Sequence, residues 1–251
     1  MKSLGIIPAR FTSSRFPGKP LVKIGQKTMI QRVYEQCLKS SALDDVIVAT
    51  DDQRIFDHVI SFGGNVKMTS ADHPSGTDRI AEVAREMDDF DLIVNIQGDE
   101  PFIRPEQIEN VLSVFDKNKK VGIATGVRPI DEVADIHNPN VVKVVFDKNG
   151  KALFFSRSPI PFLRNEKKEN WQTIHFYKHI GMYAFRRETL LKITQLPPSR
   201  LEQLESLEQL RWLENGLDIF VTLLPFDSFG IDTPEDVEQA EKIQQALKPD
   251  A

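Results

Sequence analysis

The chain has 251 residues, enough for one large α/β domain or two small ones. Hydrophobic residues make up 40% and charged residues 27%, as in an ordinary globular protein, and a single cysteine, Cys37, excludes an internal disulfide. The net charge of -5 argues against nucleic acid as the main partner. The opening residues carry too short an apolar run for a signal peptide, and no apolar stretch reaches membrane-span length, so we expect a cytoplasmic protein without a membrane partner.

Charge is distributed unevenly along this acidic chain. No acidic residue occurs from Met1 to Tyr34, whereas the same stretch contains these cations: Lys2, Arg10, Arg15, Lys19, Lys23, Lys27 and Arg32. A run of charge usually marks a solvated surface. Three of the cations fall within one loop, however, which favours a site for an anion.

The first half of the chain alternates short apolar runs with amphipathic stretches. The expected strands are 3–8, 45–50, 65–68 and 91–97, and the expected helices are 28–39, 52–62, 77–87 and one that starts at Pro105. Such alternation predicts an α/β fold whose mostly parallel, Rossmann-like sheet is flanked by helices on both faces.

The pattern changes in the second half. We expect a hairpin of strands 141–146 and 151–155, strands 179–185 and 218–224, a helix over 202–215, and a terminal helix that opens at Thr233 or Pro234. No repeat or linker interrupts the chain. The sequence therefore predicts a single domain over residues 1–251, with a β-rich inserted portion near residues 130–190.

The loop after the first strand carries the clustered cations. It reads PARFTSSRFPGKPL and contains Arg10, Arg15 and Lys19, with Gly18 allowing close backbone approach to a ligand. Arginine forks and a lysine ammonium suit phosphate oxygens. The loop matches neither a Walker A motif nor GxGxxG, which disfavours P-loop kinases and Rossmann dehydrogenases. A mobile surface loop is the alternative.

Two aspartates follow predicted strands. Asp99 ends the apolar run in NIQGDEP, and Asp232 precedes the cap of the terminal helix in GIDTPED. At the carboxyl ends of strands, such carboxylates could hold Mg²⁺ opposite a triphosphate. Asp99 could instead cap the next turn, and Asp232 could be an exposed loop residue.

Two further segments carry candidate polar groups. In DHPSGTDR, Ser75 or Thr77 could start a helix whose exposed amides, near Gly76, hold a base edge or a phosphate. In the later half, Glu208 falls in a partly apolar sector of the predicted helix and needs a partner. Either Arg211 pairs with it, or Glu208 and Gln209 bind sugar hydroxyls while Arg157 pairs a substrate carboxylate.

The ordered set of segments resembles the CMP-Kdo synthetases (3-deoxy-manno-octulosonate cytidylyltransferases). The similarity runs through IIPARFTSSRFPGKPL, VATDD, HPSGTDR, VNIQGDEPFI, NPNVVKVV, FSRSPIPF, HIGMYAF, LEQLRWLENG and GIDTPEDVEQA, almost the whole chain. The first of these is shared by several sugar cytidylyltransferases, whereas SGTDR, QGDEP, FSRSPIP and LEQLR narrow the choice. Asp78 stands where many relatives have glutamate, and RNEKKEN follows no family pattern.

The resemblance implies transfer of CMP from CTP to Kdo with release of pyrophosphate, for lipopolysaccharide synthesis, by a homodimer whose β-rich portion forms the contact. It implies triphosphate contacts by Arg10, Arg15 and Lys19, with Lys19, Arg15, Asp99 and Asp232 catalytic. Ser75, Gly76 and Arg79 would lie near the cytidine, and Asp99 and Asp232 would bind Mg²⁺. The sugar-side set would be Gln97, Arg157, His179, Tyr183, Glu208 and Gln209.

Three other activities compete with this one. A related cytidylyltransferase could act on a nonulosonic acid or on an aminated Kdo. A noncatalytic nucleotide-binding regulator is disfavoured by the carboxylate pair, which binding alone does not need. A dehydrogenase is disfavoured by the missing glycine fingerprint.

Overall fold

The computed structural model describes residues 1–12, 16–164 and 176–247. The chain forms two compact units, which are described one at a time: unit 1 comprises Met1–Glu109 and Ser228–Ala251, and unit 2 comprises Asn110–Asp227. Within the described ranges, no helix is long and apolar enough to cross a membrane. The expected organisation as a single domain with an insertion near 130–190 stays a prediction.

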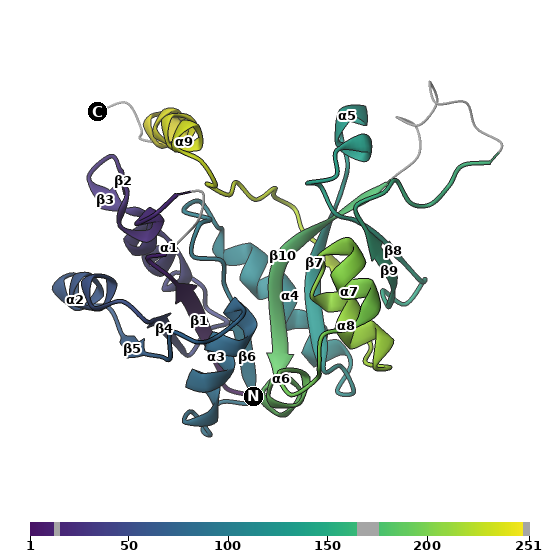
Figure 1. The fold of residues 1–251 in the computed structure, drawn as a ribbon, viewed down its shortest axis with the longest axis horizontal. Coiled ribbons are helices and arrows are strands. Elements are labelled where there is room, and N and C mark those ends of the chain that lie inside the picture. Colours follow the sequence, from purple (N-terminus) through teal and green to yellow (C-terminus); the bar gives the residue numbers. More distant parts are fainter. Residues whose placement is uncertain (13–15, 165–175, 248–251) are drawn as a thin grey trace. The chain divides into compact units, whose positions relative to one another are not determined.

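Unit 1 is built on a parallel sheet (Figure 1). Strand β1 (Ser3–Ala9) lies between β4 (Asp45–Thr50) and β6 (Leu92–Asn95), and β5 (Val66–Met68) pairs with β4 on the far side. Every residue of β1 except Pro8 is buried, as expected of a parallel strand covered on both faces. The carboxyl ends of β1, β4 and β6 consequently meet at one edge.

The other elements of unit 1 surround this sheet. They are η1 (Lys19–Leu21), β2 (Lys23–Ile24), β3 (Lys27–Thr28), α1 (Met29–Cys37), α2 (Gln53–Ser61), α3 (Gly76–Arg85) and α9 (Pro234–Leu247). Thr28, Asp52 and Ser75 are the N-caps of α1, α2 and α3, and each side chain accepts a hydrogen bond from a backbone N–H of the first turn. Helix α4 (Pro105–Lys117) spans the boundary between the units.

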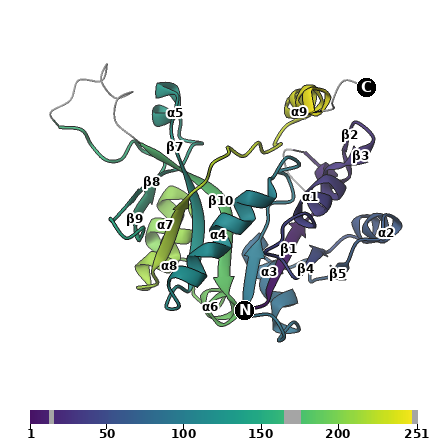
Figure 2. The ribbon, with the colours of Figure 1, turned by 180° about the vertical axis from the view of Figure 1, so that it is seen from behind.

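Unit 2 has a mixed sheet. Its strands are β7 (Ile123–Pro129), β8 (Lys143–Phe146), β9 (Ala152–Ser156), β10 (Tyr177–Arg186) and β11 (Ile219–Leu223). Strand β7 pairs with β10 antiparallel and with β11 parallel, while β8 pairs antiparallel with β9 and with β10. Figure 2 shows β8 and β9 side by side as a hairpin. The predicted α/β class, with a largely parallel sheet flanked by helices, is confirmed.

The helices of unit 2 are α5 (Val133–His137), α6 (Arg187–Ile193), α7 (Arg200–Glu205) and α8 (Gln209–Glu214). Trp212 of α8 is buried, and its ring packs edge-on against Tyr183 and Phe185 of β10 at centroid distances of 5.1 and 5.4 Å. Aromatic pairs in this arrangement add stabilisation beyond their buried area. The packing fixes α8 beside the strand that carries His179 and Tyr183.

The prediction of one continuous helix over residues 202–215 is wrong, because the structure has two helices there. Ser206 ends α7 in the left-handed conformation, at φ 51°, and α8 starts only at Gln209. The break lets Leu207 turn inward to 6% exposure, while Leu204, which the continuous helix placed in its apolar sector, is 69% exposed. Leu207 is therefore buried where the helix is interrupted.

Strand β7 was not predicted from the sequence. It contains Gly126, and a Cβ added there would lie 2.3 Å from Leu224.

Candidate functional site

A cavity of about 280 Å³ opens in unit 1 at the carboxyl ends of β1 and β6. The predicted site residues that line it are Arg10, Lys19, Ser75, Gly76, Arg79, Gln97 and Asp99. Arg15 lies outside the described residues. The structure thus gathers the phosphate-side candidates that it describes into one cavity, where parallel α/β sheets commonly bind ligands.

Lys19 joins the two predicted metal ligands. Its Nζ lies 2.6 Å from Asp99 Oδ2 and 3.4 Å from Asp232 Oδ1, and it donates a 2.8 Å hydrogen bond to the carbonyl of Ile231. The side chains of Lys19, Asp99 and Asp232 are 16%, 30% and 51% exposed. Both carboxylates therefore lie against one ammonium group, although the two aspartates are far apart in the sequence.

Backbone contacts bring these aspartates together. A Cβ added to Gly98 would lie 2.9 Å from the carbonyl oxygen of Pro8, so only glycine lets the turn after β6 pass this close to the end of β1. The Ile231 N–H then donates a 3.0 Å hydrogen bond to the carbonyl of Asp99. The segment that carries Asp232 is consequently fastened to the residue that supplies the other carboxylate.

Asp236 fixes the Asp232 backbone from the other side. Its Oδ2 accepts hydrogen bonds from the N–H groups of Asp232 and Thr233, both at 2.8 Å, and from the Thr233 hydroxyl at 3.2 Å. The hydrogen bond from Asp232 N–H is the largest cause that lowers the pKa of the Asp236 carboxyl. The terminal helix starts at Pro234, as predicted.

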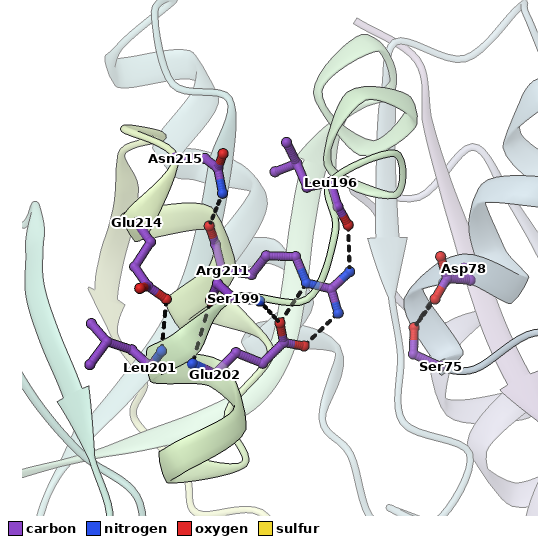
Figure 3. Close-up of polar contacts among 9 residues, drawn as sticks. All are labelled: Ser75, Asp78, Leu196, Ser199, Leu201, Glu202, Arg211, Glu214 and Asn215. Atoms are coloured by element: carbon purple, nitrogen blue, oxygen red, sulfur yellow. Dashed lines mark hydrogen bonds and ion pairs between the residues drawn. The ribbon is translucent and has the colours of Figure 1, made fainter.

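The start of α3 forms another wall of the cavity. Ser75 caps this helix, accepting from Asp78 N–H at 3.1 Å, while its hydroxyl donates to Asp78 Oδ2 at 2.6 Å (Figure 3). Gly76 is the first helical residue. Its lack of a side chain exposes the amides at the positive end of the helix, where polar or anionic groups bind favourably.

Arg79 is fully buried behind this helix start. Its guanidinium pairs with Asp51 at 2.7 Å and also donates to the Thr69 hydroxyl, whereas its Nε has no hydrogen-bond partner among the described residues. Burial lowers the pKa of Arg79, and Asp51 partly opposes that effect. Arg79 therefore supports the cavity wall through Asp51, a partner that the sequence analysis did not identify.

Arg10 is positioned through the segment before α3. Its guanidinium donates to the carbonyl of His73, and the His73 ring hydrogen-bonds to Glu82. Burial raises the pKa of Glu82, but the hydrogen bond from His73 and others outweigh it and leave that pKa lowered. His73 was not among the predicted site residues, and its position in HPSGTDR is the sequence signal of this structural role.

The remaining sugar-side candidates belong to unit 2, whereas Gln97 belongs to unit 1. Arg157 donates to three backbone carbonyls, those of Glu205 at 2.7 Å, Pro139 at 2.9 Å and Ser206 at 3.2 Å. A guanidinium has five N–H donors. These bonds therefore hold the fork in one orientation and leave it further donors for an anion.

His179 is a neutral imidazole. Burial lowers its pKa to about 3, and its Nε2 lies 2.9 Å from the Thr125 hydroxyl. That hydroxyl has one proton, and the carbonyls of Ile180 and Met182 accept from it at 3.2 and 2.8 Å. With the hydroxyl proton donated to a carbonyl, the imidazole proton is assigned to Nε2, which leaves Nδ1 as an acceptor.

Two polar atoms of unit 2 are buried without a hydrogen-bond partner among the described residues. Tyr183 Oη and Gln209 Nε2 are buried without a partner in the part of the chain that the structure describes. Burial, and secondarily the charge of Glu208, raises the pKa of Tyr183 well above its ordinary value. An unsatisfied buried polar group costs about 1–3 kcal/mol, so these atoms are suited to receive a ligand's hydroxyl groups.

The alternative that paired Glu208 with Arg211 rested on a helix that the structure interrupts. Arg211 forms a forked ion pair with Glu202, with Nε 2.7 Å from Oε2 and Nη2 on Oε1 (Figure 3). Glu202 also completes the capping box of α7 with Ser199. Glu208 occupies the N-cap position of α8, next to Gln209.

No group of three or more His, Cys, Asp or Glu side chains in the described ranges could hold a metal ion alone. Asp99 and Asp232, as a pair of carboxylates, could supply only part of a metal ion's ligand set. Mg²⁺ is commonly bound in this way, by one or two carboxylates with substrate phosphates and water supplying the other oxygens.

The fold and the cavity place the chain among the nucleotidyltransferases, and a cytidylyltransferase family model matches residues 4–219. The chain is 55% identical over 247 residues to the 3-deoxy-manno-octulosonate cytidylyltransferase of Bacteroides thetaiotaomicron, covering 96% of this chain and 98% of that one. It is 51% identical over 250 residues to the enzyme of the same name from Thermodesulfovibrio yellowstonii, with 96% and 98% coverage. The chain belongs to the 3-deoxy-manno-octulosonate cytidylyltransferase family.

A solved structure supports the same relationship. CMP:2-keto-3-deoxy-manno-octonic acid synthetase, complexed with CTP, superimposes with a TM-score of 0.93 at 42% identity, over 99% of this chain and 100% of that chain.

Proposed function

We propose that the chain transfers CMP from CTP to the anomeric hydroxyl of Kdo (3-deoxy-D-manno-octulosonate), giving CMP-Kdo and pyrophosphate. Support comes from near full-length identity to enzymes named for this reaction and from a similar structure in complex with CTP. The observation in this chain that carries the proposal is the contact of Lys19 with Asp99 and Asp232 beside the cavity.

The reaction forms one bond to the α-phosphorus and breaks another. The anomeric oxygen of Kdo bonds to phosphorus, the bond from phosphorus to the pyrophosphate oxygen breaks, and the hydroxyl proton passes to solvent. Charge builds on the departing pyrophosphate, and fixed cations stabilise it most in the transition state. We assign this role to Lys19 and Arg10, with Arg15 as the third cation predicted from the loop.

We further propose that Asp99 and Asp232 hold Mg²⁺. Two carboxylates against one ammonium show that this position already accommodates a cation, and their hard oxygen atoms suit Mg²⁺. When bound, the ion would supply positive charge at the α-phosphate and lower the pKa of the attacking hydroxyl. Gly98 and the Asp99–Ile231 backbone bond keep both carboxylates in place.

Residues of unit 2 would bind the sugar. Tyr183 Oη and Gln209 Nε2 lack partners among the described residues, so each could donate to a sugar hydroxyl. The acceptor Nδ1 of His179 could receive a hydrogen bond from another hydroxyl. Arg157, held by three carbonyls, would present its remaining N–H groups to the Kdo carboxylate, a geometry that suits a guanidinium fork.

Pyrophosphate release tests the reaction. The wild-type protein is assayed with CTP, Mg²⁺ and a sugar panel of Kdo, 8-amino-Kdo and a sialic acid, and with ATP, GTP or UTP in place of CTP. We expect turnover with CTP and Kdo. Asp99→Asn, of nearly equal size but uncharged, is expected to lower kcat by about 10²–10³ or more without loss of fold. Turnover that prefers another sugar would overturn the acceptor assignment.

The wider setting is also a proposal. We propose that the product serves lipopolysaccharide synthesis in the cytoplasm and that the protein is a homodimer, as the family resemblance implies. Exposed apolar side chains in the β-rich portion support an interface there, with Leu153 59% and Phe162 82% exposed. Sedimentation at micromolar concentration tests the dimer, and a monomer there would refute it.

A further inference from the structure

The Lys19 ammonium has two possible sets of anionic partners, the carboxylates of Asp99 and Asp232 and the triphosphate of CTP. In this structure its ammonium contacts Asp99 at 2.6 Å and Asp232 at 3.4 Å, and a carbonyl, that of Ile231, at 2.8 Å. The proposed function gives the same ammonium a second role, on the triphosphate of CTP. One ammonium group cannot make all of its contacts with the carboxylates and with the triphosphate at the same time. The contacts of Lys19 must therefore differ between the free and the nucleotide-bound protein.

Lys19 and a metal ion would compete for the carboxylates of Asp99 and Asp232. A cation bound by Asp99 and Asp232 would occupy the two carboxylates whose Oδ2 and Oδ1 atoms, respectively, Lys19 now contacts. Bringing Mg²⁺ there while the ammonium stays would place two positive groups side by side, which is unfavourable at short range. The 16% exposure of the Lys19 side chain also limits screening of that repulsion by solvent.

From these contacts we infer that Lys19 excludes the metal from the carboxylate pair until a nucleoside triphosphate draws its ammonium away, so that the metal enters together with the nucleotide. The inference rests on the proposed metal site and adds its regulation. In the metal-free protein, Lys19 neutralises the mutual repulsion of the Asp99 and Asp232 carboxylates, which the backbone contacts hold close together. Binding of CTP and metal is then positively coupled, and the coupling acts equally in both directions.

The test measures metal affinity rather than turnover. Mn²⁺ serves as the probe because it favours the same oxygen ligands as Mg²⁺, and free Mn²⁺ is counted by electron paramagnetic resonance, without CTP and then with it. The variants are Lys19→Met, which removes the charge at similar length, and Lys19→Arg, which retains it. Lys23→Met is the matched control, because Lys23 is an exposed lysine of the same basic segment.

Without CTP, we expect Lys19→Met to bind Mn²⁺ about tenfold more tightly than wild type, because it removes a partly exposed ion pair with each carboxylate. Lys19→Arg and Lys23→Met should bind as wild type does. With CTP, wild-type affinity should rise by a larger factor than that of Lys19→Met, because only the wild type has an ammonium to displace.

Asp99→Asn, alone and combined with Lys19→Met, separates the two proposals. If Asp99→Asn weakens Mn²⁺ binding in both backgrounds but Lys19→Met binds no more tightly than wild type, the metal site stands and the competition is refuted. If Asp99→Asn leaves Mn²⁺ affinity unchanged in both backgrounds, the proposed metal site and the inference fail together. Equal CTP effects in wild type and Lys19→Met would also overturn the inference. Circular dichroism checks that each variant is folded.

Discussion

We expect the Tyr183 hydroxyl to lower the stability of the fold and to strengthen the binding of Kdo. Its hydroxyl is buried without a partner among the described residues, while its ring packs against Phe185 and Trp212. Tyr183→Phe removes the unsatisfied oxygen and keeps the ring. We expect the free energy of unfolding to rise by about 1 kcal/mol and the KM for Kdo to increase, with the KM for CTP nearly unchanged.

Thermal unfolding and initial-rate kinetics measure these two effects of Tyr183→Phe. Tyr177→Phe is the matched control, since Tyr177 lies in the same strand, β10, and is no part of the proposed sugar site. A variant that loses stability and keeps its KM for Kdo would show that the Tyr183 hydroxyl has a structural partner instead.

His179 predicts a dependence of stability on pH. Burial lowers its pKa to about 3, against about 6.5 in an unfolded chain. Between these values the unfolded chain binds a proton that the folded imidazole does not, so His179 destabilises the fold increasingly as pH falls below about 6.5 and has no such effect above it.

We therefore expect His179→Gln to lose less stability than wild type between pH 6.5 and about 4. Urea unfolding at a series of pH values measures that difference. His137→Gln is the control, because His137 is an exposed residue of the same unit. Parallel stability curves for wild type and His179→Gln would contradict the prediction.

At the scale of an element, the start of helix α9 positions the loop that precedes it. Asp236 in its first turn accepts hydrogen bonds from the backbone of Asp232 and Thr233, so the helix start positions the loop that carries a proposed metal ligand. We expect Asp236→Ala to lower the free energy of unfolding by about 1 kcal/mol and to raise the Mg²⁺ concentration that gives half-maximal turnover.

Glu235→Ala provides the comparison for this helix start. Glu235 occupies the same first turn and is exposed, so its removal should leave the Mg²⁺ requirement near that of wild type. If Asp236→Ala lowers stability but keeps the wild-type Mg²⁺ curve, Asp236 is only a cap.

Ser206 and β7 mark what sequence periodicity could not predict among the elements. The helical spacing of apolar residues continues through 202–215, yet Ser206 adopts φ 51° and Leu207, directly after it, is buried. Strand β7 includes Gly126, which weakens its strand pattern, and depends on packing against Leu224. Both outcomes are decided by contacts between segments, which a single sequence does not display.

At the scale of the whole molecule, the phosphate-side candidates were the most predictable. Strand-helix alternation predicts which residues follow strands, and parallel strands bring those residues to one edge, as the contact of Lys19 with Asp99 shows. Partners such as Asp51 for Arg79, or three carbonyls for Arg157, depend on side-chain geometry and were not predicted. The roles of all these residues stay predictions.

We expect ligand binding to raise the free energy of unfolding of the protein as a whole. CTP with Mg²⁺, at one hundred times its Kd, should raise the free energy of unfolding by about 2.7 kcal/mol if it binds only the folded chain. Thermal unfolding with and without the ligand measures the shift. Asp99→Asn should show a smaller one, and an equal shift in both proteins would argue against a role for this carboxylate in nucleotide binding.

Unit 1 is discontinuous, since its last part, Ser228–Ala251, is separated from Met1–Glu109 by the whole of unit 2. During translation, a nascent chain therefore possesses Lys19 and Asp99 long before it possesses Asp232. The backbone bond between Ile231 and Asp99 forms only after Ile231 has left the ribosome. A chain that stalls or is cleaved within unit 2 lacks one carboxylate of the pair, so assembly of the carboxylate pair is restricted to polypeptides whose synthesis has reached the terminal helix.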